Sequence, residues 1–133
     1  MNWLLDTHVW VWSQLEPERL GTTTQKILLD KKQTLHISTV STLEVARLVE
    51  GGRVCLGMTM QDWVEISGSL LDLRTTELSH AHAIESYALP SPFHRDPADR
   101  MLVATARTEK YTLVTADQRI LDYDHVSTHD ARL

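Results

Sequence analysis

Short apolar runs alternate along the chain with longer segments whose apolar positions recur at helical spacing. The short runs predict buried strands at Asn2–Leu5, Thr34–Ile37 and Thr112–Thr115, with less regular candidates at 73–78 and 125–127. Strands that alternate with helical patterns of about 10 to 15 residues indicate crossover connections and a parallel sheet. We therefore expect an α/β fold, a three-layer sandwich whose central, mainly parallel sheet carries helices on both faces.

Turn and capping residues give the predicted helices their boundaries. Gly51-Gly52 is expected to end the third helix, and Pro97 suits the first position of the long helix near the C-terminus. Ser41 and Glu44 have the S-x-x-E spacing of a capping box, which predicts that the third helix opens at Ser41. Helices are expected over residues 7–16, 22–31, 41–50, 58–71, 79–89 and 97–110, with one helical turn at 120–121.

Length and composition fit a single domain over residues 1–133. Hydrophobic residues make up 42% of the chain and charged residues 23%, which is ordinary for a globular protein, and 5 Gly with 4 Pro leave little room for linkers. The single cysteine, Cys55, excludes an internal disulfide. We expect it to be buried or half-buried, in a protein that suits a reducing cytoplasm.

Charge and hydropathy limit the classes of function. No apolar run approaches the roughly 20 residues that span a bilayer, and the N-terminus lacks the pattern of a signal peptide, so we expect a cytoplasmic protein with no membrane partner. The formal net charge of −5 argues against general coating of nucleic acids, which needs a broad cationic surface. An enzyme that acts on nucleic acids is still compatible, because bound divalent cations would reverse the sign of an acidic site.

Four carboxylates lie where predicted strands end or where the following helices begin. They are Asp6, Glu44, Asp99 and Asp117. Ligands of an open parallel sheet bind outside the carboxyl ends of its strands, so these acids can converge on one pocket. Converged carboxylates repel one another unless a cation joins them, and hard oxygen ligands without cysteine favour one or two Mg²⁺ or Mn²⁺ ions. The pattern favours metal-assisted chemistry on a phosphate ester.

Each acid also has a purely structural explanation. Asp6 and Asp117 suit the N-cap of the helix that follows them, and the capping box accounts fully for Glu44. Asp96 is assigned to capping or to support of the site, whereas Asp99 is assigned to the metal, because a first-turn side chain can point past the helix end into the crevice. Capping alone does not require all these acids to meet at one edge of a sheet, so their joint placement favours function.

Neighbouring side chains are candidates for supporting roles. Thr7 and Thr115 could supply hydroxyl groups within the pocket, although threonine is also common at strand ends. Arg100 could bind phosphate oxygens or form a surface salt bridge to a nearby aspartate. His94 could contact the substrate or lie solvated in a loop. Trp10 could anchor a partner from the surface or belong to the core.

Other kinds of site have little support. His80 and His82 are two residues apart on a predicted helix, so they cannot face the same metal, and a zinc site is not expected. The chain contains neither a P-loop nor a G-x-G-x-x-G motif, so no nucleotide cofactor is implied. Covalent acyl chemistry is equally unsupported, because no Ser-His-Asp order stands out.

Four segments, taken in order, carry a resemblance to a known family. They are Leu4-Leu5-Asp6-Thr7-His8, Glu44-Val45-Ala46, Asp96-Pro97-Ala98-Asp99-Arg100-Met101-Leu102-Val103-Ala104 and Leu113-Val114-Thr115-Ala116-Asp117. Together they resemble PIN-domain proteins, and specifically the VapC-type toxins of bacterial toxin–antitoxin modules. The resemblance covers Met1 to about Tyr123, nearly the whole chain.

The resemblance implies a Mg²⁺- or Mn²⁺-dependent endoribonuclease with a parallel sheet and an acidic pocket. The family's metal-site acids fall on Asp6, Glu44, Asp99 and Asp117, and the hydroxyl that precedes the last acid falls on Thr115. The resemblance also implies a homodimer and a cognate antitoxin whose tail covers the pocket.

Our mechanistic hypothesis is that the acids hold one or two divalent ions, which bind a scissile RNA phosphate and activate a water molecule. The products would carry 5′ phosphate and 3′ hydroxyl groups. Asp117 or Glu44 could orient or deprotonate the water, while Arg100 and His94 steady the RNA backbone. Two alternatives stay open, a magnesium-binding receiver-like signalling domain and an inert PIN-like binding protein. A receiver would need paired acids after the first strand, where Asp6 stands alone.

Overall fold

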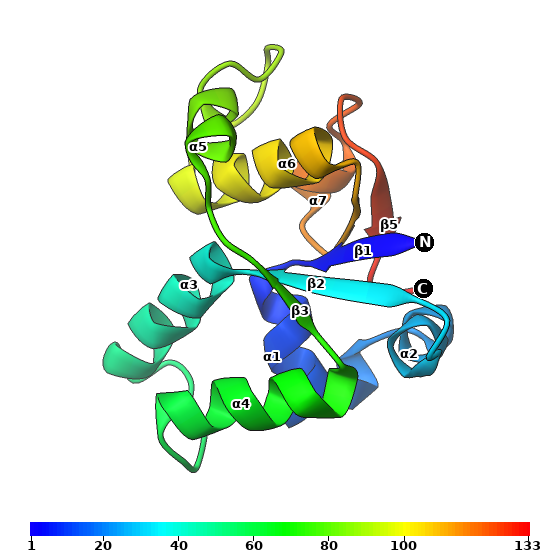
Figure 1. Ribbon diagram of the computed structural model, residues 1–133, viewed down its shortest axis with the longest axis vertical. Helices are drawn as coiled ribbons and strands as arrows, with labels where there is room; N and C mark the ends of the chain where they lie inside the picture. The colour runs from blue at the N-terminus through cyan, green and yellow to red at the C-terminus, as the bar shows by residue number, and fades with distance from the viewer.

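A five-stranded parallel sheet lies at the centre of the computed structural model, which describes residues 1–133 (Figure 1). The spatial order of the strands is β3-β2-β1-β4-β5, and every pair of neighbours is parallel. The strands are β1 (Asn2–Leu5), β2 (Thr34–Ser38), β3 (Arg74–Thr76), β4 (Thr112–Thr115) and β5 (Thr128–Asp130). The predicted α/β sandwich is therefore confirmed, and its sheet is wholly parallel.

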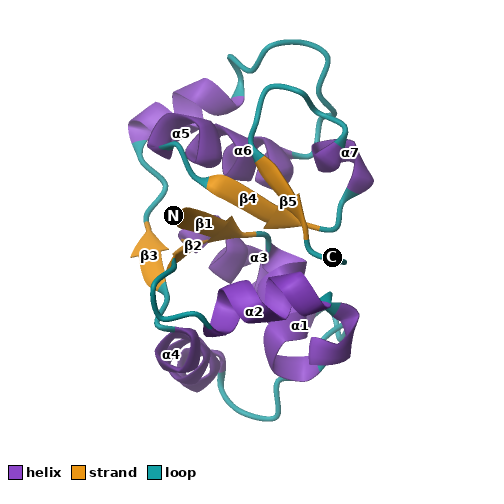
Figure 2. Ribbon diagram, turned by 90° about the vertical axis from the view of Figure 1, so that its right-hand side faces the viewer, coloured by secondary structure: helices purple, strands orange, loops and turns teal.

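Helices cover both faces of the sheet (Figure 2). One face carries α1 (Thr7–Leu15), α2 (Thr22–Leu29), α3 (Thr39–Glu50) and α4 (Met60–Leu71), with a 3-10 turn at Pro17–Arg19. The other face carries α5 (His80–Ser86), α6 (Pro97–Glu109) and α7 (Gln118–Leu121). No helix is long and apolar enough to cross a membrane.

The alternation of side chains along β1 divides the core between the two faces. Trp3 and Leu5 belong to the cluster packed under α1 and α4, whereas Leu4 belongs to the cluster packed under α6. All three side chains are buried. A strand whose successive side chains point to opposite faces must be apolar throughout when helices cover both faces, which explains the uninterrupted Trp3-Leu4-Leu5 run.

The order of the strands creates the position for a ligand site. The chain moves from β1 to β2 on one side, whereas β4 pairs with β1 on the other, so β1 and β4 flank the switch point of the sheet. Leu5 pairs with Val114, and the Asp6 backbone N–H donates to the Val114 carbonyl oxygen at 2.9 Å. The chain continues past these paired ends to Asp6 and Asp117. Parallel sheets bind ligands at such a switch point.

The start of the third helix and the position of the last strand differ from the sequence prediction. The third helix begins at Thr39, because the Ser38 hydroxyl accepts from the Val40 backbone N–H at 3.0 Å and caps the helix. The predicted capping box of Ser41 and Glu44 is therefore wrong. The last strand also starts later than expected, at Thr128, where residues 128–130 pair with β4.

Burial decides between the two alternatives for Trp10 and corrects the prediction for Cys55. Trp10 is fully buried, since its ring lies 4.5 Å from that of Trp63 and its Nε1–H donates to the Ser67 hydroxyl at 3.0 Å. It cannot anchor a partner from the surface. Cys55, expected to be at least half-buried, is exposed in the segment between α3 and α4.

Candidate functional site

A crevice of about 320 Å³ opens at the carboxyl ends of β1 and β4. All four predicted metal-site acids line it, together with Asp96. The complete lining is Asp6, His8, Trp12, Glu44, Asp96, Asp99, Ala116, Asp117 and Arg119. The fold thus brings together carboxylates that are separated by more than a hundred positions of sequence, as the placement argument predicts.

Asp6 is fixed from two directions at the base of the crevice. One carboxylate oxygen accepts from the Thr7 backbone N–H at 2.8 Å and caps α1, while the other accepts from the Thr115 hydroxyl at 2.6 Å. The Thr115 hydroxyl also accepts from the Asp117 backbone N–H at 3.0 Å. Because Thr7 and Thr115 are buried, these bonds lock the ends of β1 and β4 together and orient the Asp6 carboxylate.

Glu44 reaches the crevice from the second turn of α3. Its carboxylate accepts from the Thr7 hydroxyl at 2.5 Å, and that hydroxyl lies 2.9 Å from the buried hydroxyl of Ser41. Ser38 already caps the helix, so Glu44 is not needed to cap it. This contact with Thr7 places Glu44 beside Asp6 and removes the structural explanation that the capping box offered.

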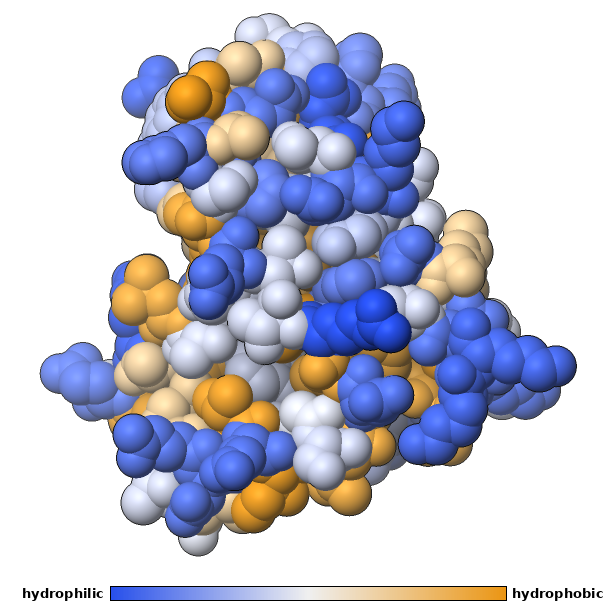
Figure 3. All heavy atoms as spheres, in the orientation of Figure 1, coloured by the Kyte–Doolittle hydropathy of each residue, from blue (hydrophilic) through white to orange (hydrophobic).

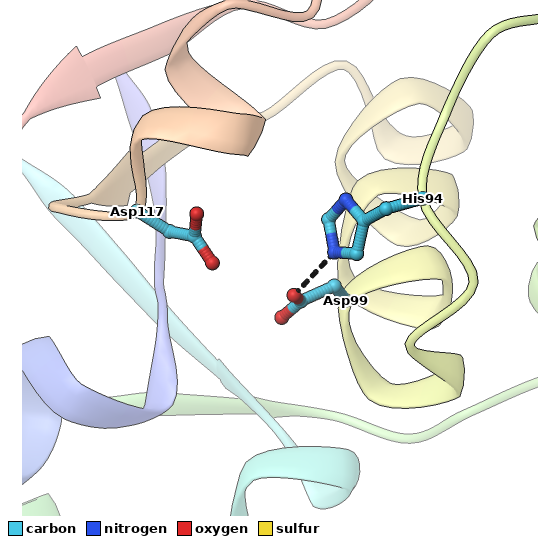
Figure 4. Close-up of side chains that lie close together, drawn as sticks. All are labelled: His94, Asp99 and Asp117. Atoms are coloured by element: carbon cyan, nitrogen blue, oxygen red, sulfur yellow. Dashed lines mark hydrogen bonds and ion pairs between the residues drawn. The ribbon is translucent and has the colours of Figure 1, made fainter.

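Asp96 caps α6 as predicted, and Asp99 lines the crevice from the first turn of that helix. Asp96 is the N-cap of α6 and accepts from the Asp99 backbone N–H at 3.1 Å. Asp99 lies in the first turn, is nearly buried, and accepts from His94 Nε2 at 2.7 Å (Figure 4). Candidate ligand atoms of His94, Asp99 and Asp117 all lie within 4.8 Å of one another. This grouping adds a histidine nitrogen to the predicted carboxylate set.

Arg119 is a member of the site that the sequence did not lead us to expect. Its guanidinium donates to Asp117 at 3.0 Å and reaches Asp99 at 3.5 Å, while its backbone N–H donates to Asp117 at 2.9 Å. The available signal was its position two residues after the strand-end Asp117, within the helical turn that this aspartate caps. Arg119 supplies the only side-chain ion pairs from a lysine or arginine to the acids of the crevice.

Burial and crowding of like charges disturb the ionisation of these acids. Burial raises the pKa of Asp6 to about 6; its hydrogen bond from Thr115 opposes that rise and the negative charge of Asp99 adds to it. Burial likewise raises the pKa of Glu44 and of Asp99. For Asp117, burial acts upward, but the hydrogen bonds and charge of Arg119 outweigh it and lower the pKa. In the metal-free protein, the negatively charged forms of Asp6, Glu44 and Asp99 are therefore less stable than they would be in water.

Two of the supporting predictions have different outcomes. The contact of Arg100 with phosphate stays a prediction, but its salt bridge to an aspartate is wrong, because Arg100 donates to the backbone carbonyl oxygens of Ser86, Phe93 and His94. It fastens the loop before α6 to α5 instead. His94 is not solvated, because only 18% of its side chain is exposed and it bonds to Asp99. Its contact with substrate stays a prediction.

His8 and Trp12 complete one wall of the crevice. Both lie on α1, and their rings are 6.1 Å apart. His8 is exposed and follows the Asp6-Thr7 pair directly in sequence, which was the signal for its place in the site. Trp12 is partly buried, packs against the core under α1 and also lines the crevice.

The residues present fit a hard divalent cation. The crevice offers oxygen atoms from five carboxylates and no thiolate, which is the donor chemistry of magnesium and manganese sites. Burial, with a smaller contribution from the neighbouring carboxylates, raises the pKa of Asp6, Glu44 and Asp99, and a bound cation would act against both effects. The Nδ1 atom of His94 is also buried without a hydrogen-bond partner. The geometry defines an acidic site with oxygen donors suited to such a cation.

A wholly parallel sheet with this crevice at its switch point defines the chain as an α/β protein with an acidic ligand site. The model of the PIN domain family matches residues 3–126, and the chain belongs to that family. It is 34% identical over 122 residues to Ribonuclease VapC22 of Mycobacterium tuberculosis, a match that covers 92% of each protein. This membership leaves the receiver-like alternative without support.

Solved structures show the same fold at lower identity. VapBC2 from Rickettsia felis, bound to a DNA fragment from its promoter, contains a chain with a TM-score of 0.71 and 20% identity over 97% of this chain and 98% of its own. FitAcB from Neisseria gonorrhoeae contains one with a TM-score of 0.66 and 21% identity over 97% of each chain. These likenesses show that the chain shares the arrangement of its sheet and helices with these proteins.

Proposed function

We propose that this VapC-type PIN protein hydrolyses RNA at the acidic crevice, as the ribonuclease toxin of a toxin–antitoxin module. The observation that carries the proposal is the convergence of Asp6, Glu44, Asp99 and Asp117 on one opening at the switch point of the sheet. A homologue named as a ribonuclease, matched over nearly the whole chain, supports RNA as the substrate. The intact acid set argues against an inert member of the family.

The four acids are proposed to hold one or two Mg²⁺ or Mn²⁺ ions. A bound divalent cation supplies charge stabilisation to the phosphate oxygens and lowers the pKa of water. Asp6 is oriented for this role by Thr7 and Thr115, and Asp99 by the hydrogen bond from His94. Asp96 supports the site indirectly, because it fixes the first turn of α6 from which Asp99 projects.

One of the carboxylates is also proposed to accept the proton of the attacking water. Attack by water forms a new bond from oxygen to phosphorus and breaks the bond to the 3′ oxygen, which leaves a 5′ phosphate and a 3′ hydroxyl. Glu44 is proposed as the proton acceptor, because the Arg119 guanidinium pairs with Asp117 whereas no lysine or arginine pairs with Glu44. The departing 3′ oxygen takes its proton from solvent.

Two protein partners belong to the proposal. Solved structures of the same fold are toxin–antitoxin complexes, which supports a cognate antitoxin for this chain. We also propose a homodimer. Large apolar side chains are exposed at two separate helices, Ile66 and Leu70 on α4, and Ile84 on α5 with Tyr87 directly after it, and they provide two faces for two partners. Figure 3 shows apolar side chains gathered over the part of the surface that α4 forms.

Induced expression in a bacterial host tests the proposal. The wild-type chain should arrest growth and produce new RNA ends with 5′ phosphate groups, whereas Asp6→Asn should do neither while it accumulates to the same level. Coexpression with the product of the adjacent gene should restore growth. Growth arrest by both forms, with no new RNA ends, would contradict a ribonuclease toxin.

A further inference from the structure

A second hollow, of about 570 Å³, adjoins the acidic crevice. It lies between the loop that precedes α6 and the segment that contains and follows α7. Its lining is Pro92, Phe93, His94, Arg119, Asp122, Tyr123, Asp124 and His125. Arg119 lines both openings, and His94 bonds directly to Asp99 of the crevice. The hollow is large enough for a small-molecule ligand, because such sites are typically about 300–1,000 Å³.

Aromatic rings form a continuous wall of this hollow. The ring of Phe93 lies 4.3 Å from that of His94 and 4.6 Å from that of Tyr123, and the ring of His125 lies 5.3 Å from that of Tyr123. Tyr123 is held rigidly, since it is buried and its hydroxyl donates to the Pro90 carbonyl oxygen at 2.5 Å. His125 is exposed and forms no side-chain hydrogen bond. The wall therefore combines the fixed ring of Tyr123 with the solvent-accessible ring of His125.

Two carboxylates lie on the same hollow and have different surroundings. Asp122 accepts a hydrogen bond from the Gln118 side-chain amide at 2.7 Å, so one of its carboxylate oxygens already has a partner within the chain. Asp124 is exposed and forms neither a hydrogen bond nor an ion pair through its side chain. A carboxylate only accepts hydrogen bonds, so Asp124 is available for a ligand that presents N–H donors.

We propose that the hollow binds an unstacked base of the RNA next to the cleaved phosphodiester, with a preference for guanine. The inference rests on the proposed ribonuclease function. Single-stranded RNA is commonly recognised by bases that stack on aromatic side chains and bond through their edges. Guanine carries N1–H and N2–H₂ side by side, a donor pair that matches one carboxylate, whereas uracil offers one N–H between two carbonyl oxygens that Asp124 would repel.

The charges of the hollow favour a base over a phosphate. Asp122 and Asp124 would repel a phosphate group, and Arg119 lies at the border with the crevice, where the RNA backbone would pass. A guanidinium at that border can bind the phosphate that links the base to the cleaved bond. The arrangement thus assigns the base to the aromatic hollow, the linking phosphate to Arg119 and the cleaved phosphate to the acids.

Binding of RNA to an inactive form of the protein tests this assignment. The probes are two short fluorescein-labelled RNA oligomers that differ in a single base, guanine or uracil, titrated with the Asp6→Asn protein in the presence of magnesium. Fluorescence polarisation should show about tenfold tighter binding of the guanine oligomer, as a matched carboxylate and donor pair would give. Asp124→Asn, added to the same protein, should reduce this preference to about twofold or less.

Two further variants separate recognition from stability. Asp72→Asn removes the same charge at the other end of the sheet, at a left-handed position that asparagine tolerates, and should keep the full preference for guanine. His125→Ala should weaken both oligomers about equally, by roughly fivefold or more, because stacking tolerates any base.

The outcomes distinguish the hollow from the ribonuclease function. Equal affinity for the two oligomers, or an unchanged preference after Asp124→Asn, would overturn the base site even if the wild-type protein cleaves RNA. A preference that depends on Asp124 would support the base site even if the wild-type protein failed to cleave RNA.

Discussion

At the scale of single residues, Asp6 shows how one side chain serves both fold and site. Its two oxygens accept hydrogen bonds from Thr7 and Thr115, so it caps α1 and joins the ends of two strands. The same burial that makes these bonds effective raises its pKa to about 6. A buried carboxylate at this position therefore costs stability at neutral pH unless a cation compensates for it.

The raised pKa of Asp6 predicts a pH-dependent penalty in the metal-free protein. The unfolded chain loses the proton near the ordinary pKa of 3.8 and the folded chain near 6, so the contribution of Asp6 to stability is present below pH 4 and is lost as the pH rises to 6. Relative to Asp6→Asn, the wild-type free energy of unfolding should fall by roughly 2 to 3 kcal/mol between pH 4 and pH 7.

Urea denaturation in EDTA measures this difference, with Asp62→Asn on the exposed surface of α4 as the control for loss of one charge. A difference between wild type and Asp6→Asn that stayed constant across this range would show that the buried carboxylate is not the source of the penalty.

Arg119 provides a second prediction at this scale. It pairs with Asp117 and Asp99 in the chain alone, so it competes with a divalent cation for the same carboxylates. Arg119→Gln should tighten manganese binding by about two- to fivefold, the effect of one exposed ion pair, while the KM for RNA rises because a phosphate contact is lost. Calorimetric titration and steady-state cleavage measure the two effects.

Arg132→Gln is the matched control. Arg132 pairs with the aspartate two residues before it, Asp130, as Arg119 pairs with Asp117, but it lies outside the crevice. If both variants change manganese affinity alike, direct competition by Arg119 is wrong.

Side-chain direction limited what could be predicted for individual residues. The positions of Asp6 and Asp117 followed from strand ends and that of Asp99 from the start of a helix, because that information is local. Arg100 could not be placed in the same way, since its guanidinium turns back to carbonyl groups of α5 and of the loop before α6. Arg119 was missed because its place in the sequence does not show that its guanidinium turns back to Asp117 and Asp99.

At the scale of elements, most strands and helices could be predicted. A sheet that helices cover on both faces needs strands that are apolar throughout, and these strands stand out in the sequence. The start of α3 could not be predicted, since Ser38 and Ser41 are both plausible caps by sequence. The structure selects Ser38, and Ser41 is used to contact Thr7. The last strand was misplaced because β5 is short and half-buried, so it lacks the apolar signal of β1 and β4.

The cap of α3 can be tested through stability. Ser38→Ala removes the acceptor for the Val40 backbone N–H and should lower the free energy of unfolding by about 1 kcal/mol. Ser69→Ala, an exposed substitution within α4, should leave it unchanged or raise it slightly, because alanine favours helix interiors. Urea denaturation provides both values. Equal effects of the two changes would contradict the assignment of Ser38 as the cap.

At the scale of the whole molecule, the order of the strands turns scattered acids into one site. In this parallel sheet the chain adds β2 on one side of β1 and β4 on the other, which leaves an opening beyond the carboxyl ends of β1 and β4, and α3 and α6 begin close enough to supply Glu44 and Asp99. This convergence of the acids could be predicted, because ligand sites of parallel sheets lie outside the carboxyl ends of the strands. The second hollow was not predicted, because its walls come from two loops whose approach depends on the packing of α6 and α7.

The proposed homodimer gives a prediction at this scale. Sedimentation velocity should yield a mass about twice the 15.2 kDa of the chain. Ile84→Glu on α5 and Ile66→Glu on α4 place a charge on one exposed apolar face each, so the variant that disrupts the dimer face should sediment as a monomer. The other variant should stay dimeric. A monomeric wild-type protein at micromolar concentration would contradict the homodimer.

The central claim is that the four converged carboxylates act together, through a divalent cation, to cleave RNA. The most direct measurement is the rate of RNA cleavage by the purified protein in magnesium, compared among the wild type, Asp6→Asn, Glu44→Gln, Asp99→Asn and Asp117→Asn, with Asp62→Asn as control. Each variant of the crevice should be slower by about a hundredfold or more, the control should match the wild type, and EDTA should stop the reaction. Cleavage at the wild-type rate by the crevice variants, or in EDTA, would contradict the account.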